Sequence, residues 1–255
     1  MSCTPDPEPV AAGTAIVVIP GIGGHPAFHA DLIRALQEAA PVLTQPHGDF
    51  FAPPWSDLQA HVAHWRAFIE QAGAQRIVLV GVSFGAQVAL AVARALGRRL
   101  VGLLLISWWP IGWLERAALR ALHALPPTPL QRLLGRWAFR WSELKSDDPA
   151  ALRKTRTALY DNEATVQARL WARLMCCREA RMALVPPIRA AVHLVYGDRE
   201  LARLRATLIH TRLRALGTLH RVPGDHAVST RASPNFENTV LRLVRQALNP
   251  AETVA

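Results

Sequence analysis

Cysteine is scarce in this sequence, and its placement excludes a disulfide-stapled domain. Only three cysteines occur among 255 residues, at Cys3, Cys176 and Cys177. Adjacent cysteines rarely bridge each other, because the backbone between them is too short for good disulfide geometry. There is also no CxxC pair, so we expect no metal site and no cofactor, and we expect the protein to work in the reducing cytoplasm.

Long apolar runs are absent as well. The longest is Val101–Leu114 (VGLLLISWWPIGWL), which Pro110 interrupts. A membrane-spanning helix needs about 20 apolar residues, so we expect no membrane span. The N-terminal segment MSCTPDPEPVAAG is acidic and lacks a positively charged n-region, which argues against a signal peptide.

The chain is basic, yet it contains no run of five or six basic residues. Lys and Arg total 29 against 19 Asp and Glu, a net charge of +10, and Arg supplies most of it. Arg spread at helical spacings is typical of solvated helix faces. An acidic partner or nucleic acid is the alternative, but no nucleic-acid-binding motif accompanies the charge, so we expect no nucleic-acid partner.

Apolar strand patterns alternate with amphipathic helix patterns along the chain. This predicts an α/β fold, a mostly parallel, doubly wound sheet of about six strands in a single domain over residues 1–255. A proline-broken helical section over residues 111–181 is predicted to be a lid inserted between the fourth and fifth strands. The predicted strands cover residues 14–20, 42–45, 77–81, 100–107, 192–196 and 218–222. The other predicted helices cover residues 26–40, a helix opened by Ser56, one from the third strand to residue 96, residues 201–216, and one opened by Ser233-Pro234.

The third predicted strand ends in Gly81-Val82-Ser83-Phe84-Gly85, and a helical pattern follows at once. A strand that turns sharply into a helix, with Ser at the turn and Gly two positions to either side, is the nucleophile-elbow arrangement. Glycine is needed at the flanks because a Cβ there leaves no room for the strained turn. Ser83 is therefore the candidate nucleophile.

Two other strand ends carry candidate partners for Ser83. Asp198 follows the fifth strand and His226 follows the sixth, and ligands bind at the carboxyl ends of parallel strands. We predict a triad in which His226 is the general base and Asp198 orients its imidazole. Asp198 could instead cap the helix that follows it, Glu200 is a second candidate acid, and His226 could be a surface-loop histidine. Asp225 is a weak candidate, because it would point away from its neighbour His226.

The oxyanion of the tetrahedral intermediate needs two hydrogen-bond donors. One should be the Phe84 N–H, directly after the nucleophile. The other should come from the glycine-rich turn after the first strand, at the N–H of Ile22 or of Gly23. That turn could also be an ordinary tight turn, and it matches neither GxGxxG nor GxxxxGK[ST].

Together these residues resemble the α/β-hydrolase fold. The segments IPGIGGHPAFHADLIRAL, APVLTQPHG, DLQAHVAHWRAFIEQAG, VLVGVSFGAQVALAVARAL and PGDHAVST more narrowly resemble thioesterases of polyketide and nonribosomal peptide assembly lines. Many of those enzymes carry their acid after the strand that follows the nucleophile helix. Here that strand ends in Ile106-Ser107-Trp108-Trp109, without a carboxylate, whereas Asp198 stands at the position that most other α/β-hydrolases use.

The resemblance implies a serine hydrolase that cleaves an acyl thioester or ester, and more narrowly a thioesterase with hydrolytic or cyclising release. Trp108, Trp109 and Trp113 could wall an acyl pocket, or they could pack the lid on the core. The lid carries 11 Arg and 2 Lys against 4 Glu and 3 Asp, which could attract an acidic acyl or peptidyl carrier protein. The alternatives are a carboxylesterase or lactonase, an acyltransferase, and an α/β-hydrolase-like binding protein without catalysis. The sequence does not predict an oligomeric state.

Overall fold

The computed structural model describes residues 13–21, 29–45, 58–108, 188–200, 217–225, 228–230 and 233–249. These stretches contain six strands, β1 Thr14–Ile19, β2 Val42–Thr44, β3 Arg76–Val82, β4 Leu100–Ile106, β5 Ala191–Gly197 and β6 Thr218–Val222. They also contain the helices α1 Ala30–Gln37, α2 Leu58–Gln71, α3 Phe84–Leu96 and α9 Pro234–Leu248, with short 3₁₀ turns η2 Gly97–Arg99 and η3 Val228–Thr230. The predicted lid at 111–181 and the predicted helix at 201–216 lie outside the described residues, so the lid and the single-domain organisation stay predictions.

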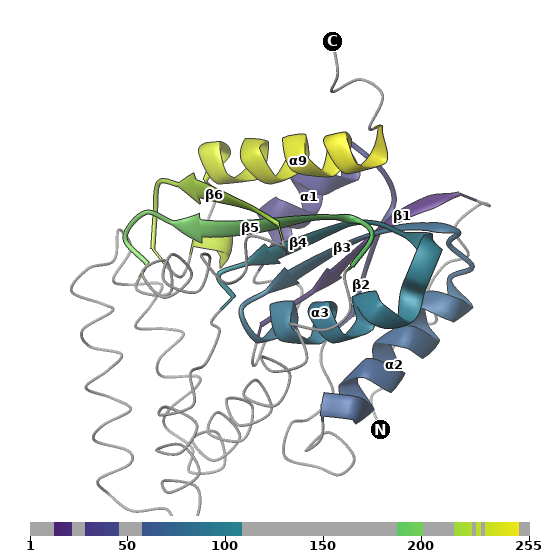
Figure 1. Cartoon of the computed structure of the whole chain (residues 1–255). Coiled ribbons are helices and arrows are strands. Elements are labelled where there is room, and N and C mark those ends of the chain that lie inside the picture. The colour runs from purple at the N-terminus through teal and green to yellow at the C-terminus, as the bar shows by residue number, and fades with distance from the viewer. Residues whose placement is uncertain are drawn as a thin grey trace, which may run out of the picture.

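The six strands form one sheet in the order β2-β1-β3-β4-β5-β6, and every neighbouring pair is parallel (Figure 1). The predicted fold class is therefore confirmed. From β1 the chain first moves outward to β2, and it then returns to the other side of β1 and builds β3 to β6. The strand order thus reverses between β1 and β3, and in open α/β sheets the ligand crevice lies beyond the strand ends at such a point.

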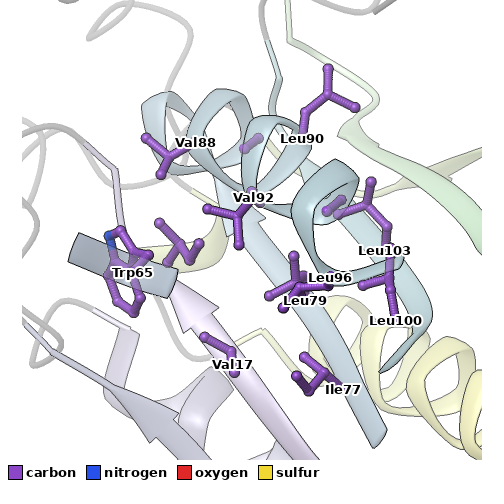
Figure 2. Packing of buried hydrophobic residues seen from close by; sticks show 14 of the residues in the cluster. Val17, Trp65, Ile77, Leu79, Val88, Leu90, Val92, Leu96, Leu100 and Leu103 are labelled. Carbon is purple, nitrogen blue, oxygen red and sulfur yellow. The ribbon is translucent and has the colours of Figure 1, made fainter. Parts of the chain in front are cut away.

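Helices cover both faces of the sheet, which is why the central strands are apolar at nearly every position. Helices α1 and α9 lie on one face and α2 and α3 on the other (Figure 1). In β1, Val17 belongs to the core beneath α2 and α3, while Ile16 and Val18 belong to the core beneath α1 and α9. Figure 2 shows Leu79 and Trp65 within the first of these cores.

The strand ends lie within one residue of the predicted ones, and α3 ends at Leu96 as predicted, whereas the first helix differs. The predicted helix over 26–40 is too long: α1 begins at Ala30, ends at Gln37 and is followed by a turn, while residues 26–28 lie outside the described part. In this turn the Ala39 N–H donates to the Leu36 carbonyl at 3.0 Å, an i→i+3 bond that replaces the helical ladder. Helix α9 follows Ser233 as its N-cap with a proline in its first turn, as predicted.

Candidate active site

Ser83 occupies the turn between β3 and α3, and its backbone is strained. Its φ is +53° and its ψ is −115°. Among the described residues other than glycine, only Ser83 and Ser107 have a positive φ. An L-residue holds such a conformation only where the surrounding structure enforces it, and such residues cluster at active sites. The strand–turn–helix context predicted for the nucleophile elbow is present.

The two glycines of the GxSxG pattern allow the strand and the helix to approach closely. A Cβ on Gly85 would lie 2.1 Å from the Ile19 carbonyl oxygen, and a Cβ on Gly81 would lie 2.5 Å from the Ala86 Cα. Both distances are shorter than any real contact, so neither position accepts a side chain without a backbone shift. The spacing of the motif therefore follows from how α3 packs against the ends of β1 and β3.

The end of β1 lies beside the nucleophile. A Cβ on Gly21 would meet the Ser83 Cβ at 3.3 Å, so the first residue of the glycine-rich turn contacts the elbow. Phe84 is the first residue of α3, and the first N–H groups of a helix point out of its N-terminus. The Phe84 ring is buried and meets the buried His61 ring edge-on at 5.5 Å. Ile22 lies outside the described residues.

The two candidate acids after β5 differ in burial. The Asp198 side chain is 49% exposed, and its Oδ1 accepts the Gly224 N–H at 3.0 Å. Glu200 is only 5% exposed. Its Oε2 accepts the Ser107 hydroxyl at 3.0 Å and the Gly197 N–H at 3.2 Å. Of the two candidate acids after β5, Glu200 is therefore the buried one, and Asp198 is half in solvent.

Ser107, directly after β4, connects the nucleophile strand to the strand that precedes the acids. The Ser83 N–H donates to the Ile106 carbonyl at 2.8 Å, and the Ser107 N–H donates to the Val195 carbonyl at 2.9 Å. Ser107 is fully buried with a φ of +52°. From the sequence, Ser107 was noted only because the end of this strand lacks a carboxylate. Its hydroxyl in fact donates to the carboxylate of Glu200, which follows the neighbouring strand β5, and no local sequence signal shows this.

Trp108 is buried in the core and bonded at both ends. Its indole Nε1 donates to Gln87 Oε1 on α3 at 2.8 Å, and its carbonyl accepts the Tyr196 hydroxyl at 2.7 Å. Burial, followed by the charge of Glu200, raises the pKa of Tyr196, so the phenol stays protonated and donating. Trp108 thus ties β4, β5 and the elbow helix together. Gln87 was missed from the sequence, although it is the only polar side chain among the buried residues of α3.

Several predicted site residues lie outside the described part of the chain. These are Ile22, Trp109, Trp113 and His226. The nearest described residues are Asp225 and Val228: Asp225 is buried, and the Val228 N–H donates to the Asp225 carbonyl at 3.2 Å.

Within the described stretches, no group of three or more His, Cys, Asp or Glu side chains is arranged to hold a metal ion. None of the helices that the structure describes is both long and apolar enough to cross a bilayer.

The parallel sheet and the strained serine between β3 and α3 agree with a comparison of the sequence with models of protein families. The model of the family described as "Alpha/beta hydrolase family" matches residues 16–237. The chain belongs to the alpha/beta hydrolase family. A comparison with curated protein sequences finds no match.

Solved structures share the fold of this α/β-hydrolase at low sequence identity. A bromoperoxidase from Bacillus anthracis is 13% identical, with a TM-score of 0.63 and 93% of each chain covered. BpoC from Mycobacterium tuberculosis H37Rv, described as a non-heme bromoperoxidase, is 17% identical, with a TM-score of 0.67 and coverage of 92% of this chain and 93% of that one. At such identities the likeness shows the α/β-hydrolase fold alone, and neither structure bears on the narrower resemblance to assembly-line thioesterases.

Proposed function

We propose that this α/β-hydrolase is a serine hydrolase that cleaves an acyl thioester or ester through an acyl-enzyme on Ser83. The observation that carries the proposal is the backbone of Ser83, which is held at a φ of +53° between β3 and α3. The cost of such a conformation is about 1–3 kcal/mol, and it is explained if the turn exists to present the hydroxyl. The location of Ser83 next to the end of β1 also supports the proposal, because ligands bind where the strand order of such a sheet reverses.

The reaction requires a base and a carboxylate beside Ser83. His226 takes the proton of the Ser83 hydroxyl while Oγ bonds to the acyl carbon, and it then gives this proton to the departing thiol or alcohol. Water then attacks the acyl-enzyme with the same proton transfers through His226, and the carboxylic acid product is released while the Ser83 hydroxyl is restored. The oxyanion of each tetrahedral intermediate is bound by the Phe84 N–H and by an N–H of the turn that follows β1, at Ile22 or Gly23.

For the carboxylate we favour Glu200 over the Asp198 expected from the sequence. An orienting carboxylate works best out of water, because its attraction for the imidazolium is stronger in a low dielectric. Glu200 is buried and anchored by Ser107 and the Gly197 N–H through one oxygen. Asp198 is half exposed and its Oδ1 is bonded to the Gly224 N–H.

Among serine hydrolases, thioesterase is the activity that we propose, and the support is the sequence resemblance. In this proposal an acyl or peptidyl carrier protein delivers the substrate to the basic lid, and Trp109 and Trp113 wall the acyl pocket. Trp108 was expected beside them, and its burial and its bond to Gln87 support the core-packing alternative for that residue. A carboxylesterase or lactonase, or an acyltransferase, would use the same triad without a carrier.

The proposal is tested with one acyl group presented on three leaving groups: a carrier-protein thioester, an N-acetylcysteamine thioester and a p-nitrophenyl ester. Wild type is expected to release the acid from all three, with the highest kcat/KM for the carrier thioester, and Ser83→Ala is expected to release none. Equal rates on the ester and both thioesters would favour the carboxylesterase. Turnover by Ser83→Ala equal to that of wild type would reject the serine mechanism, and the absence of any turnover or acyl adduct would favour the non-catalytic binding protein.

A further inference from the structure

Side chains from distant parts of the chain hold the segment between β6 and α9 on both sides of position 226. On the N-terminal side, Asp198 Oδ1 accepts the Gly224 N–H at 3.0 Å. On the C-terminal side, the His29 Nδ1–H donates to the Ser229 carbonyl at 3.0 Å across 200 residues of sequence. Neither bond belongs to a helix or to the sheet, so each is specific to this segment.

His29 is a buried histidine with one identified task. It precedes α1 as its N-cap residue, is 4% exposed, and makes no side-chain capping bond to the helix. Burial lowers the pKa of His29, and the bond to the Ser229 carbonyl opposes this only in part. The imidazole is therefore neutral near pH 7, and the acceptor carbonyl fixes its proton on Nδ1.

The Asp198 side of the segment is fixed by more than one contact. The Asp198 N–H donates to the Val222 carbonyl at 2.8 Å, and the Arg199 N–H donates to the Gly224 carbonyl at 3.0 Å. Gly197 lies so close that a Cβ there would be 2.4 Å from the Gly224 carbonyl oxygen. The end of β5 is therefore joined to Val222 and Gly224 by backbone hydrogen bonds as well as by the Asp198 side chain.

The described residues nearest to position 226 are also packed. Asp225 and Val228 are 7% and 2% exposed. The Val228 N–H donates to the Asp225 carbonyl at 3.2 Å. Position 226 is covalently attached to Asp225 and lies two residues before Val228, so a shift at either end of the segment changes where residue 226 can be.

We propose that Asp198 and His29, through their bonds to Gly224 and Ser229, form a two-point clamp that positions His226 for proton transfer with Ser83. The inference rests on the proposed function, and it makes both side chains positioning residues. It also gives the half-exposed Asp198 carboxylate a role that does not require contact with the imidazole. A proton-transfer partner displaced by about 1 Å can cost about 100-fold in rate, so loss of either bond should be visible in kcat.

The variants separate the hydrogen bond from the size and charge of each side chain. His29→Leu and Asp198→Ala remove the bonds. His29→Asn keeps an N–H donor near the place of Nδ1, and Asp198→Asn keeps the acceptor oxygen without the charge. His193→Leu is the matched control, because it also removes a half-buried histidine bond, to His220 at 3.1 Å, away from the carboxyl ends of the strands.

The first measurement does not depend on catalysis. Hydrogen–deuterium exchange of peptides that cover residues 222–230 should be about tenfold faster or more in His29→Leu and in Asp198→Ala than in wild type, because the segment opens locally. Exchange in His29→Asn, Asp198→Asn and His193→Leu should match wild type. Unchanged exchange in both bond-removing variants would show that the clamp does not exist.

The second measurement is steady-state kinetics on a p-nitrophenyl acyl ester. In His29→Leu and Asp198→Ala, kcat should fall about 10- to 100-fold while KM changes less than about twofold, since the lost interaction acts on the chemical step. The two amide variants should recover most of kcat, and His193→Leu should keep it. Faster exchange with unchanged kcat would overturn the positioning role. A wild-type protein without turnover would reject the proposed function instead, and exchange would still decide whether the clamp exists.

Discussion

The choice between Glu200 and Asp198 gives the sharpest prediction, because each residue has an amide variant that preserves its observed hydrogen bonds. In Glu200→Gln, the remaining carbonyl oxygen can still accept from the Ser107 hydroxyl and the Gly197 N–H, which both meet a single oxygen in wild type. What is lost is the negative charge and the second oxygen. The variant should therefore fold while failing to stabilise the imidazolium.

The expected size of the loss follows from the role of the acid. Replacing the orienting carboxylate of a serine triad by its amide lowers kcat by about 10⁴, which corresponds to about 5.4 kcal/mol of transition-state stabilisation. We expect a loss of about 10³–10⁴ for Glu200→Gln, since the amide N–H₂ would face the imidazole and select the wrong tautomer. In Asp198→Asn the acceptor for the Gly224 N–H is kept, and kcat should stay within about threefold of wild type.

The assay is kcat on a p-nitrophenyl acyl ester across pH 5–9, with thermal unfolding measured alongside to show that both variants fold. The reverse ranking, with Asp198→Asn reduced by three orders of magnitude and Glu200→Gln near wild type, would refute the assignment from burial. It would restore the acid that the sequence predicts.

Three further predictions concern the packing behind the site and the response to pH. Gly85→Ala should lower the free energy of unfolding by about 3 kcal/mol or more and abolish activity, because its Cβ would meet the carbonyl at the end of β1 at 2.1 Å, as urea melts would show. Trp108→Phe should cost about 1–3 kcal/mol in the same melts, since it removes the indole N–H from the buried Gln87 oxygen. Burial and the neighbouring His220 lower the pKa of His193 to about 4. The stability that depends on neutral His193 is therefore complete above its unfolded pKa of about 6.5 and is lost as the pH falls toward 4, by about 1 kcal/mol after solvent screening, whereas His193→Gln should show a flatter pH dependence of unfolding.

The fold was predictable because its signals are local. Continuous apolar runs such as that of β4 are typical of strands covered on both faces, and Gly, Ser and Gly at fixed spacing mark the elbow. The predicted end of the first helix was three residues too late, because i→i+3 bonds tighten the chain before β2 and the hydrophobic pattern does not reveal them.

The choice of the triad carboxylate could not be made from the sequence. Asp198 and Glu200 are two residues apart, and each follows the same strand closely enough to be a triad member. The buried one, Glu200, is bonded to Ser107, which lies 93 residues earlier in the chain and is brought there by the pairing of β4 with β5. The contact of His29 with Ser229 spans 200 residues and is equally invisible to local patterns.

The most direct test of the central claim is the site of covalent labelling by a fluorophosphonate probe, read by intact mass and peptide mapping. The account predicts one adduct per chain on Ser83 in wild type and no adduct in Ser83→Ala. Stoichiometric labelling at another residue, or a folded wild-type protein that stays unlabelled while a known serine hydrolase in the same tube reacts, would contradict it.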